Sequence, residues 1–287
     1  MAFNKIQEYL NTDDATAGTL LIPKLIMPKL IAERNKALLP REMAAQVWGP
    51  SQIQGSSFTV NLDEVDSMSI RQVGEGAEIP LDNQGYESVT YTPVKYGVAI
   101  RITREMQEDS QFELLNRNIG LAGKRFAENE TKLILTALDG ANATTAGGAQ
   151  VTIANITDSM EDVEDNDFEP TDITMGNEVV KDLRNIDTFV EADKAGNREM
   201  MDRGFVGTIY AMSASKFSSS TKVAPSTSHK KYAYIFDRAE AYGIAIKRDI
   251  TVENFDLATY DMSGAAVTQR IDVQLLRSKA VSKITSS

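Results

Sequence analysis

The chain has 287 residues, 42% of them hydrophobic and 25% charged, which is ordinary for a soluble globular protein with a sizeable core. It has no cysteine and one histidine, which excludes disulfides, thiolate sites, histidine-cluster metal sites and a cysteine nucleophile. The net charge of −11 argues against binding nucleic acid through its phosphates and against an anionic membrane surface.

Residues 1–50 are predicted to form an N-terminal arm followed by a short helix. Polar residues interrupt the apolar ones at the start, so we expect no signal peptide and synthesis in the cytoplasm. Pro28 suits the first turn of a helix that runs to about Leu39 and stops before Pro40.

Residues 51–102 are predicted to form a long β-hairpin. Phe58, Val60 and Leu62 alternate with polar residues, and a second alternating run covers 89–102, with the turn-rich "VGEGAEIPLDNQG" between them. At about 3.3 Å per residue the two arms would reach roughly 50 Å. Because an isolated two-stranded ribbon is at best marginally stable in water, we expect another copy of the protein to support it.

Residues 103–140 contain the strongest helical pattern. Apolar residues from Phe112 to Ala137 recur at spacings of three and four. A helix over 111–139 would be roughly 43 Å long. Gly140 is well placed to end it.

Residues 141–240 are predicted to alternate short helices and strands after the link "GANATTAGGAQ". "ITDSMEDVEDNDF" indicates an acidic helix, "TDITMG" a buried strand, "NEVVKDLRNI" a helix capped by Asn177, and "VGTIYAMS" one more strand. Residues 241–287 alternate again and predict returning strands with a C-terminal tail. The expected fold class is α+β, with antiparallel sheet and one long helix.

Three stretches imitate functional motifs. "GEGAEI" at Gly74 lacks the third glycine and the following helix of a dinucleotide loop, which favours a flexible hairpin tip. "DNDFEP" at Asp165 lacks the turn glycine of a calcium loop, which favours a solvated acidic face. His229 lies in the loop-like "STSHKKY", so we expect a solvated side chain rather than a general base. We therefore expect no catalytic, cofactor-binding or metal-binding residue and no enzymatic activity.

The stretch "VKYGVAIRITREMQEDSQFELLNRNIGLAGKRFAENETKLIL" looks like a passage from an extended loop into a spine helix. Together with "ITMGNEVVKDLRNI", "YGIAIKRDITVENF" and "TQRIDVQLLRSKAVSKI", and with the order of the elements, it resembles the major capsid protein of tailed phages, which has the Hong Kong 97-like fold. The resemblance implies an extended loop at 51–102 and a spine helix at 103–140. It also implies an α/β axial domain at 141–240 and a peripheral-domain sheet completed by 241–287.

The resemblance further implies a subunit that assembles with itself into pentamers and hexamers. These would form the icosahedral head of a tailed virus and enclose its double-stranded DNA without sequence-specific binding. It implies a portal as partner and leaves a decoration protein open. The hairpin begins near residue 52, which leaves little chain for a removable scaffold-like region, so we expect a separate scaffolding protein. Some members cross-link a lysine of the extended loop to a neighbour. Residues 51–94 contain no lysine, so we do not expect this chemistry.

Two alternatives remain open. An encapsulin-like shell of a cellular compartment would have the same fold and would be distinguished by a groove that binds cargo. A carboxylate-dependent enzyme in residues 151–240 would require one defined pocket with convergent carboxylates of strongly perturbed pKa.

The hairpin and the long helix carry opposite charges. The tip region of the hairpin is acidic, with Glu75, Glu78, Asp82 and Glu87 against the single base Arg71. The bases of the helix are Arg117, Lys124, Arg125 and Lys132. Three of these bases are spaced by seven and eight residues and would share one side of the helix. We hypothesise that the hairpin of one subunit lies along basic groups of the next. The alternative is two ordinary solvated surfaces.

Overall fold

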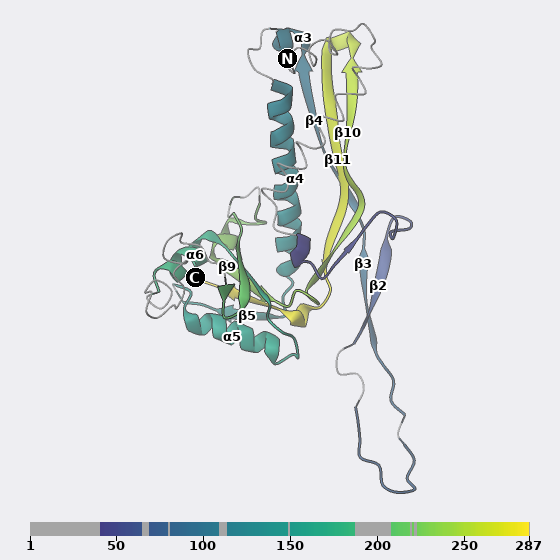
Figure 1. Ribbon diagram of the computed structural model, residues 1–287, viewed down its shortest axis with the longest axis vertical. Coiled ribbons are helices and arrows are strands. Elements are labelled where there is room, and N and C mark those ends of the chain that lie inside the picture. The colour runs from purple at the N-terminus through teal and green to yellow at the C-terminus, as the bar shows by residue number, and fades with distance from the viewer. Residues whose placement is uncertain are drawn as a thin grey trace, which may run out of the picture.

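The computed structural model describes residues 41–64, 69–79, 81–108, 114–148, 150–186, 208–218, 220 and 223–286. The expected arm and the helix ending at Leu39 lie outside these residues. Figure 1 shows three parts: a long helix beside long strands, a smaller α/β part, and a hairpin that projects away from both.

A four-stranded sheet forms the elongated part, in the order β1-β10-β11-β4. Its strands are β1 (Gln46–Trp48), β10 (Tyr242–Leu257), β11 (Met262–Leu275) and β4 (Val94–Thr103). β10, β11 and β4 are antiparallel neighbours, whereas β1 is parallel to β10. Burial alternates along β11 from Ala265 to Val273, as expected for a strand with one face against a core.

The predicted long helix is present as α4 (Leu114–Leu138), which runs beside the sheet (Figure 1). It is preceded by the short helix α3 (Arg104–Glu108), which follows β4 directly. The hydroxyl of Thr103 accepts the backbone N–H of Met106 at 3.2 Å, so the last residue of the strand satisfies a free donor at the helix start. At the other end Gly140 donates to the carbonyl of Ala137 at 3.0 Å, just past the last helical residue.

The lower half of α4 packs against both sheets of the molecule. Ile134 and Leu138 share one buried cluster with Tyr242 of β10 and with Tyr234 and Phe236 of the neighbouring sheet. A separate small cluster joins the middle of the helix, at Phe126, to the elongated sheet. The helix therefore packs against both sheets, and burial of these large side chains stabilises the contact between the two parts of the molecule.

The smaller part contains a six-stranded sheet in the order β5-β12-β9-β6-β8-β7. Its strands are β5 (Ala143–Ala146), β12 (Val281–Thr285), β9 (Tyr232–Phe236), β6 (Asp172–Met175), β8 (Met212–Lys216) and β7 (Thr208–Ile209). Its helices are α5 (Ile153–Glu164) and α6 (Asn177–Arg184). Short 3-10 helices complete the chain: η1 (Arg41–Met43), η2 (Thr227–Lys231), η3 (Ala258–Tyr260) and η4 (Ser278–Ala280).

Four details of this part differ from the prediction. The link "GANATTAGGAQ" contains a strand, β5, which pairs with β12. "VGTIYAMS" forms two strands, because Tyr210 and Ala211 take positive φ angles and turn the chain. The N-cap of α6 is Gly176 rather than Asn177. The last strand, β12, belongs to this six-stranded sheet and not to the sheet that contains β10 and β11.

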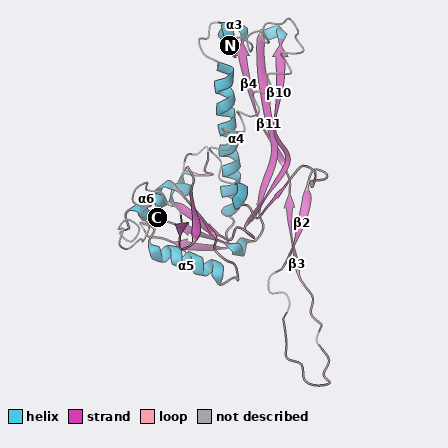
Figure 2. Cartoon of the chain, in the orientation of Figure 1, coloured by secondary structure: helices cyan, strands magenta, loops and turns pink. Residues whose placement is uncertain are grey.

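The hairpin consists of β2 (Phe58–Asp63) and β3 (Tyr86–Tyr91). The second run of the sequence is divided near Pro93, because the residues after it form β4 and pair with β11 instead. Figure 2 shows that regular pairing is confined to the base of the hairpin.

An aromatic cluster holds this base. The rings of Phe58 and Tyr91 stack 5.1 Å apart, and Trp48 lies 4.9 Å from Tyr91. A Cβ at Gly243 would overlap the Trp48 ring and the Tyr91 hydroxyl, so only glycine leaves room for the cluster. The base is therefore anchored to the edge of the four-stranded sheet.

Candidate functional site

The outer part of the hairpin presents large apolar side chains to solvent. Ile70 and Leu81 are 104% and 98% exposed, and Ile79 is 75% exposed. In Figure 1 the hairpin extends away from the rest of the described chain, and none of the described helices and strands of the same subunit covers it. Large apolar side chains gathered on one projecting segment mark an interaction surface.

Asp82 stabilises the tip from within. Its carboxylate accepts the backbone N–H of Ser69 at 2.9 Å, the Ser69 hydroxyl at 3.1 Å, and the N–H of Asn83 at 3.1 Å. These hydrogen bonds, those from Ser69 above all, lower the pKa of Asp82. Arg71 donates to the same Ser69 hydroxyl. Asp82 thus links the two arms of the tip through Ser69, and Arg71 supports Ser69 from the same arm.

The other predicted acidic residues lie in different surroundings. Glu75 and Glu78 are exposed at the tip. Glu87 lies at the base, where it lines a cleft of about 90 Å³ with Arg277 and Lys279 of its own chain. Among the described residues Glu75 and Glu78 form no ion pair and lie away from the bases near Glu87, so these two are the clearest candidates for the expected contact with another subunit.

The predicted basic residues of α4 are divided as well. Lys124 is exposed and Lys132 is half-buried. Arg125 forms an ion pair with Glu128, one helical turn away. The side chain of Arg117 lies outside the described residues. Among the described side chains no ion pair joins the hairpin to α4, and Figure 1 shows them far apart in one subunit.

The prediction of a solvated His229 is wrong. Its side chain is on η2, and the residue is 3% exposed. Its Nε2 lies 2.8 Å from Oδ2 of Asp139, at the end of α4, and its Nδ1 lies 2.8 Å from the hydroxyl of Ser226. Asp139 also accepts from Tyr234 at 2.8 Å and from Lys283 at 2.7 Å. These contacts fasten the end of α4 to the six-stranded sheet.

Serine, histidine and aspartate are thus aligned, as in a hydrolase. Ser226, however, lies three residues before His229 and forms a capping box with it at the start of η2. Neither described cleft is lined by Ser226. The sequence contained a signal for this arrangement, since "STSH" has the Ser-x-x spacing of a capping box with histidine in place of glutamate or glutamine.

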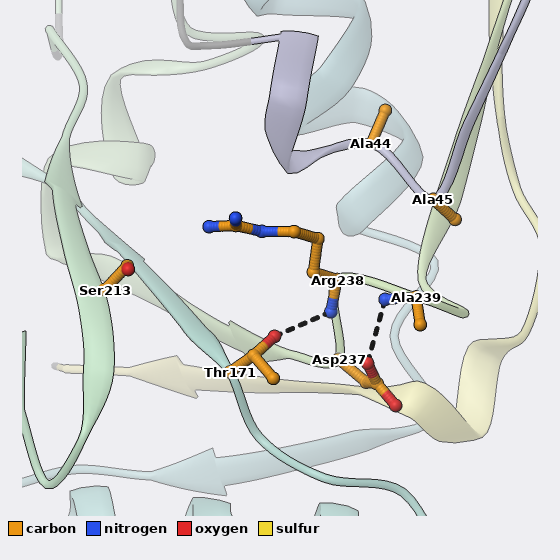
Figure 3. Close-up of a pocket in the computed structure, with 7 residues that line it drawn as sticks. All are labelled: Ala44, Ala45, Thr171, Ser213, Asp237, Arg238 and Ala239. Carbon is orange, nitrogen blue, oxygen red and sulfur yellow. Dashed lines mark hydrogen bonds between the residues drawn. The ribbon is translucent and has the colours of Figure 1, made fainter.

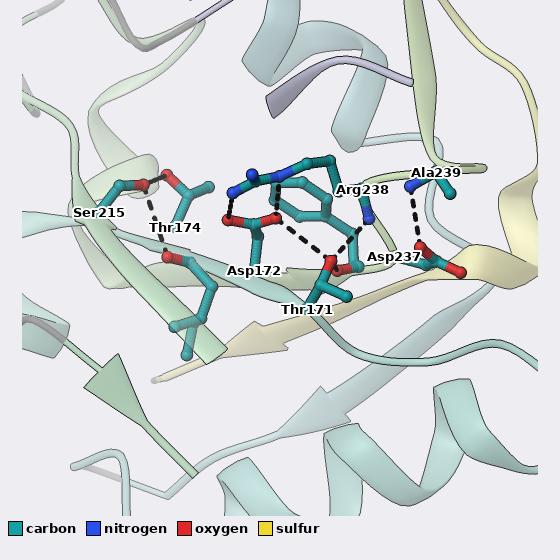
Figure 4. A network of polar contacts seen from close by, with 9 residues as sticks. Thr171, Asp172, Thr174, Ser215, Asp237, Arg238 and Ala239 are labelled. Atoms are coloured by element: carbon teal, nitrogen blue, oxygen red, sulfur yellow. Dashed lines mark hydrogen bonds and ion pairs between the residues drawn. The ribbon is translucent and has the colours of Figure 1, made fainter. Parts of the chain in front are cut away.

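The larger cleft, of about 440 Å³, lies beside β6, between the two sheets (Figure 3). Its most prominent side chain, Arg238, forms a bidentate ion pair with the fully buried Asp172, at 2.6 and 2.8 Å. Figure 4 shows how the Thr171 hydroxyl joins this pair to the backbone of Arg238. Among the described lining residues the one carboxylate is Asp237, which accepts the N–H of Ala239.

Neither cleft has the features of a carboxylate enzyme. The described lining of the larger one contains a single carboxylate and does not include the chain's only histidine. The smaller one contains Glu64 and Glu87, but 90 Å³ is well below the roughly 300 Å³ of an ordinary ligand site. Within the described part of the chain no group of three or more potential ligands could hold a metal ion, and no helix is long and apolar enough to cross a membrane.

A family model for phage capsid proteins matches residues 86–276. The chain belongs to the phage capsid protein family. The match covers β3, β4, α4 and most of both sheets, which is the region where the sequence resemblance was strongest. This is a family of structural proteins, and it places the protein in the viral head rather than in a cellular compartment.

Solved capsid structures share the fold of this capsid protein. The capsid of cyanophage P-SCSP1u is 13% identical, with a TM-score of 0.66 and coverage of 88% of both chains. The mature capsid of bacteriophage PhiM1 is 10% identical, with a TM-score of 0.65 and coverage of 84% of this chain and 85% of that one. The structure from Microbacterium phage Oxtober96 is 15% identical, with a TM-score of 0.62 and coverage of 82% of this chain and 88% of that one. No curated protein sequence matches the chain significantly.

Proposed function

We propose that this capsid protein is the major subunit of a tailed-phage head and assembles into pentamers and hexamers through its hairpin. One observation carries the proposal: the hairpin projects from the subunit and exposes Ile70, Ile79 and Leu81. Burying one such side chain contributes about 1.5–3 kcal/mol, and a shell repeats the contact many times. A second copy of the subunit is always present at the same concentration as the hairpin itself, so we take a second copy as the partner that buries these side chains.

The elements take the roles that the resemblance implies. α4 serves as the spine helix, the four-stranded sheet as the peripheral domain, and the six-stranded sheet with α5 and α6 as the axial domain. The shell encloses double-stranded DNA without reading its sequence, in keeping with the net charge of −11. A portal and a separate scaffolding protein act with it, and a decoration protein remains an open addition. The subunit catalyses no reaction.

The test is assembly of the purified protein, followed by sedimentation and electron microscopy. The double variant Ile70→Ser/Leu81→Ser should lose assembly while its urea unfolding stays unchanged, because both side chains are already solvated in the subunit. The control Ile70→Val/Leu81→Met keeps the surface apolar and should assemble. A wild-type protein that stays monomeric at high concentration, with or without scaffold, contradicts the proposed function. Normal shells from the double serine variant contradict only the apolar contact.

The charge hypothesis is tested at the two acidic residues that remain free. Reversal of Glu75 and Glu78 to lysine should weaken assembly most at low salt, because exposed ion pairs are screened. The compensating reversal Lys124→Glu, added to the same protein, should restore part of the lost assembly. Arg125 is unsuitable for this test, since its substitution also breaks the pair with Glu128. If the charge-reversed protein assembles normally at low salt, the charge contact is refuted. The apolar contact of the hairpin then remains as the proposed contact between subunits.

A further inference from the structure

The strand that leads into the long helix, β4, forms an open edge of the four-stranded sheet. Among the described strands β4 pairs with β11 alone, in unbroken register over all ten of its residues. Gly97, in the middle of β4, is exposed. Because glycine has no side chain, this exposure is exposure of the backbone. The N–H and C=O groups of a strand point to its two sides alternately, so about five residues of β4 present groups that β11 does not pair.

This edge lacks the features by which proteins usually protect an exposed strand. Bulges, proline and inward-pointing charges are the common means of preventing edge pairing. The ladder between β4 and β11 has no register shift, and β4 contains no proline. Its apolar residues Val94 and Val98 are also exposed. A long, regular and partly apolar edge of this kind is suited to receive an added strand.

The opposite side of the sheet is less suited to this role. There the described strand β1 pairs with only three residues of β10. The rest of β10 has register shifts in its ladder, which bend a strand and disturb its pairing. Its charged residues are of both signs: Lys247, Arg248, Asp249, Glu253 and Asp256. The charged residues of β4 are Lys95 and Arg101, both basic. β4 is therefore the edge that favours an acidic partner.

The outer hairpin of a second copy has the matching properties. Within the described residues, 69–73 of its first arm form no backbone–backbone hydrogen bond, and the N–H of Ser69 is bound by the side chain of Asp82 instead. This stretch, "SIRQV", contains no proline and contains the β-branched residues Ile70 and Val73. The tip around it has four acidic residues against one basic residue, Arg71. The arm is therefore a free strand-forming segment in acidic surroundings.

We propose that residues 69–73 of one capsid subunit add to the free edge of β4 in a second copy, as a fifth strand of its four-stranded sheet. The inference rests on the proposed function, since it names the surface of the neighbouring subunit that receives the hairpin. Main-chain hydrogen bonds give such a contact its affinity, and side chains give it specificity. Figure 1 shows the outer hairpin pointing away from β4 of its own subunit, so the arm comes from another copy.

Pairing of β4 with β4 of a second copy is disfavoured by the charges of the strand itself. In an antiparallel pair centred on Val98, Lys95 of one strand lies opposite Arg101 of the other. Like charges directly opposite each other on a sheet are destabilising. The acidic hairpin brings the opposite charge to the same two residues, so the hairpin is the occupant that the edge favours.

Disulfides between subunits test the pairing, because the natural chain has no cysteine and gives no background. Gln72→Cys or Val73→Cys, on opposite sides of the arm, is combined with Lys95→Cys, Ala99→Cys or Arg101→Cys in β4. A disulfide requires the two Cβ atoms to lie about 3.5–4.5 Å apart, which neighbouring strands provide. After oxidation of assembled shells, at least one combination should give a ladder of covalent oligomers on a non-reducing gel.

The matched control keeps the hairpin cysteine and moves the other one to β10. Gln72→Cys/Glu253→Cys should run as single chains, and a ladder from it would overturn the proposal. Dimers from Ala99→Cys alone would indicate pairing of β4 with β4 and would also overturn it. Shells in which no combination with β4 cross-links overturn this inference alone. A wild-type protein that forms no shells overturns the proposed function as well.

Hydrogen exchange of the wild-type protein is a second measurement that needs no variant. In the unassembled subunit about half of the amide hydrogens of residues 94–103 face the free edge and should exchange quickly. In shells these hydrogens should exchange roughly tenfold more slowly or less, because they are then bonded to the arm. Residues 252–257 of β10 should gain no such protection. Unchanged exchange of β4 on assembly overturns the proposal. Protection of β4 without any cross-link to the hairpin means that another segment or protein covers the edge, and it overturns the proposal too.

Discussion

The buried ion pair between Arg41 and Glu130 gives the sharpest prediction for the stability of the subunit. Glu130 lies on α4 and is 0% exposed. Both of its carboxylate oxygens are bound by the guanidinium, through Nε and, at 3.0 Å, through Nη2. Burial works to lower the pKa of Arg41, but the contacts with Glu130 and Asp249 raise it above its ordinary value. Arg41→Ala leaves the carboxylate without its bidentate partner, which costs about 3–5 kcal/mol.

Urea unfolding of the unassembled subunit measures this loss, as a lower midpoint with an unchanged slope. The control removes both charges: Arg41→Met/Glu130→Leu should recover most of the stability, because an apolar replacement of a buried pair is often nearly neutral. A loss below about 1 kcal/mol for the single variant, or a double variant as unstable as the single one, would refute the reasoning.

Two further predictions concern Asp139 and covalent chemistry. Because its pKa is lower in the folded protein than its ordinary value of 3.8, Asp139 stabilises the fold above that pH, and this contribution is lost as pH falls below it. Asp139→Asn should therefore melt below wild type at pH 7 and approach it in acid, and parallel melting curves at all pH values would contradict this. Particles boiled in detergent should run as single 31.5 kDa chains, since residues 51–94 contain no lysine, and a ladder of oligomers would count against it.

The elements that the sequence predicts well are those whose signal is local. Alternation revealed β2, β4 and the strands after Tyr242, and three-and-four spacing revealed α4, because each pattern reflects one buried face of one element. β5 was missed because "ATTA" lies among glycines and is a strand only through its pairing with β12, far away in the chain. Pairing between distant segments has no local pattern to reveal it.

The side chains of the candidate site show the same limit. His229 sits in a stretch with loop composition, yet its burial depends on Asp139, 90 residues away. Asp82 looked free for another subunit, but it is bound to Ser69 across the tip. Charge and composition identified the hairpin and the helix as oppositely charged surfaces. They could not show which charges are already paired within one chain.

The position of β12 has a consequence for the timing of assembly. This strand lies between β5 and β9 and pairs with both, so the small sheet is incomplete until residues 281–285 are available. A nascent chain on the ribosome has already made α4 and the hairpin, but lacks an interior strand of this sheet. Domains fold as units once their residues are synthesised. It follows that a chain with an exposed hairpin is not yet a finished subunit, and that synthesis of residues 281–285, rather than exposure of the hairpin, sets the earliest moment at which a subunit can join a shell.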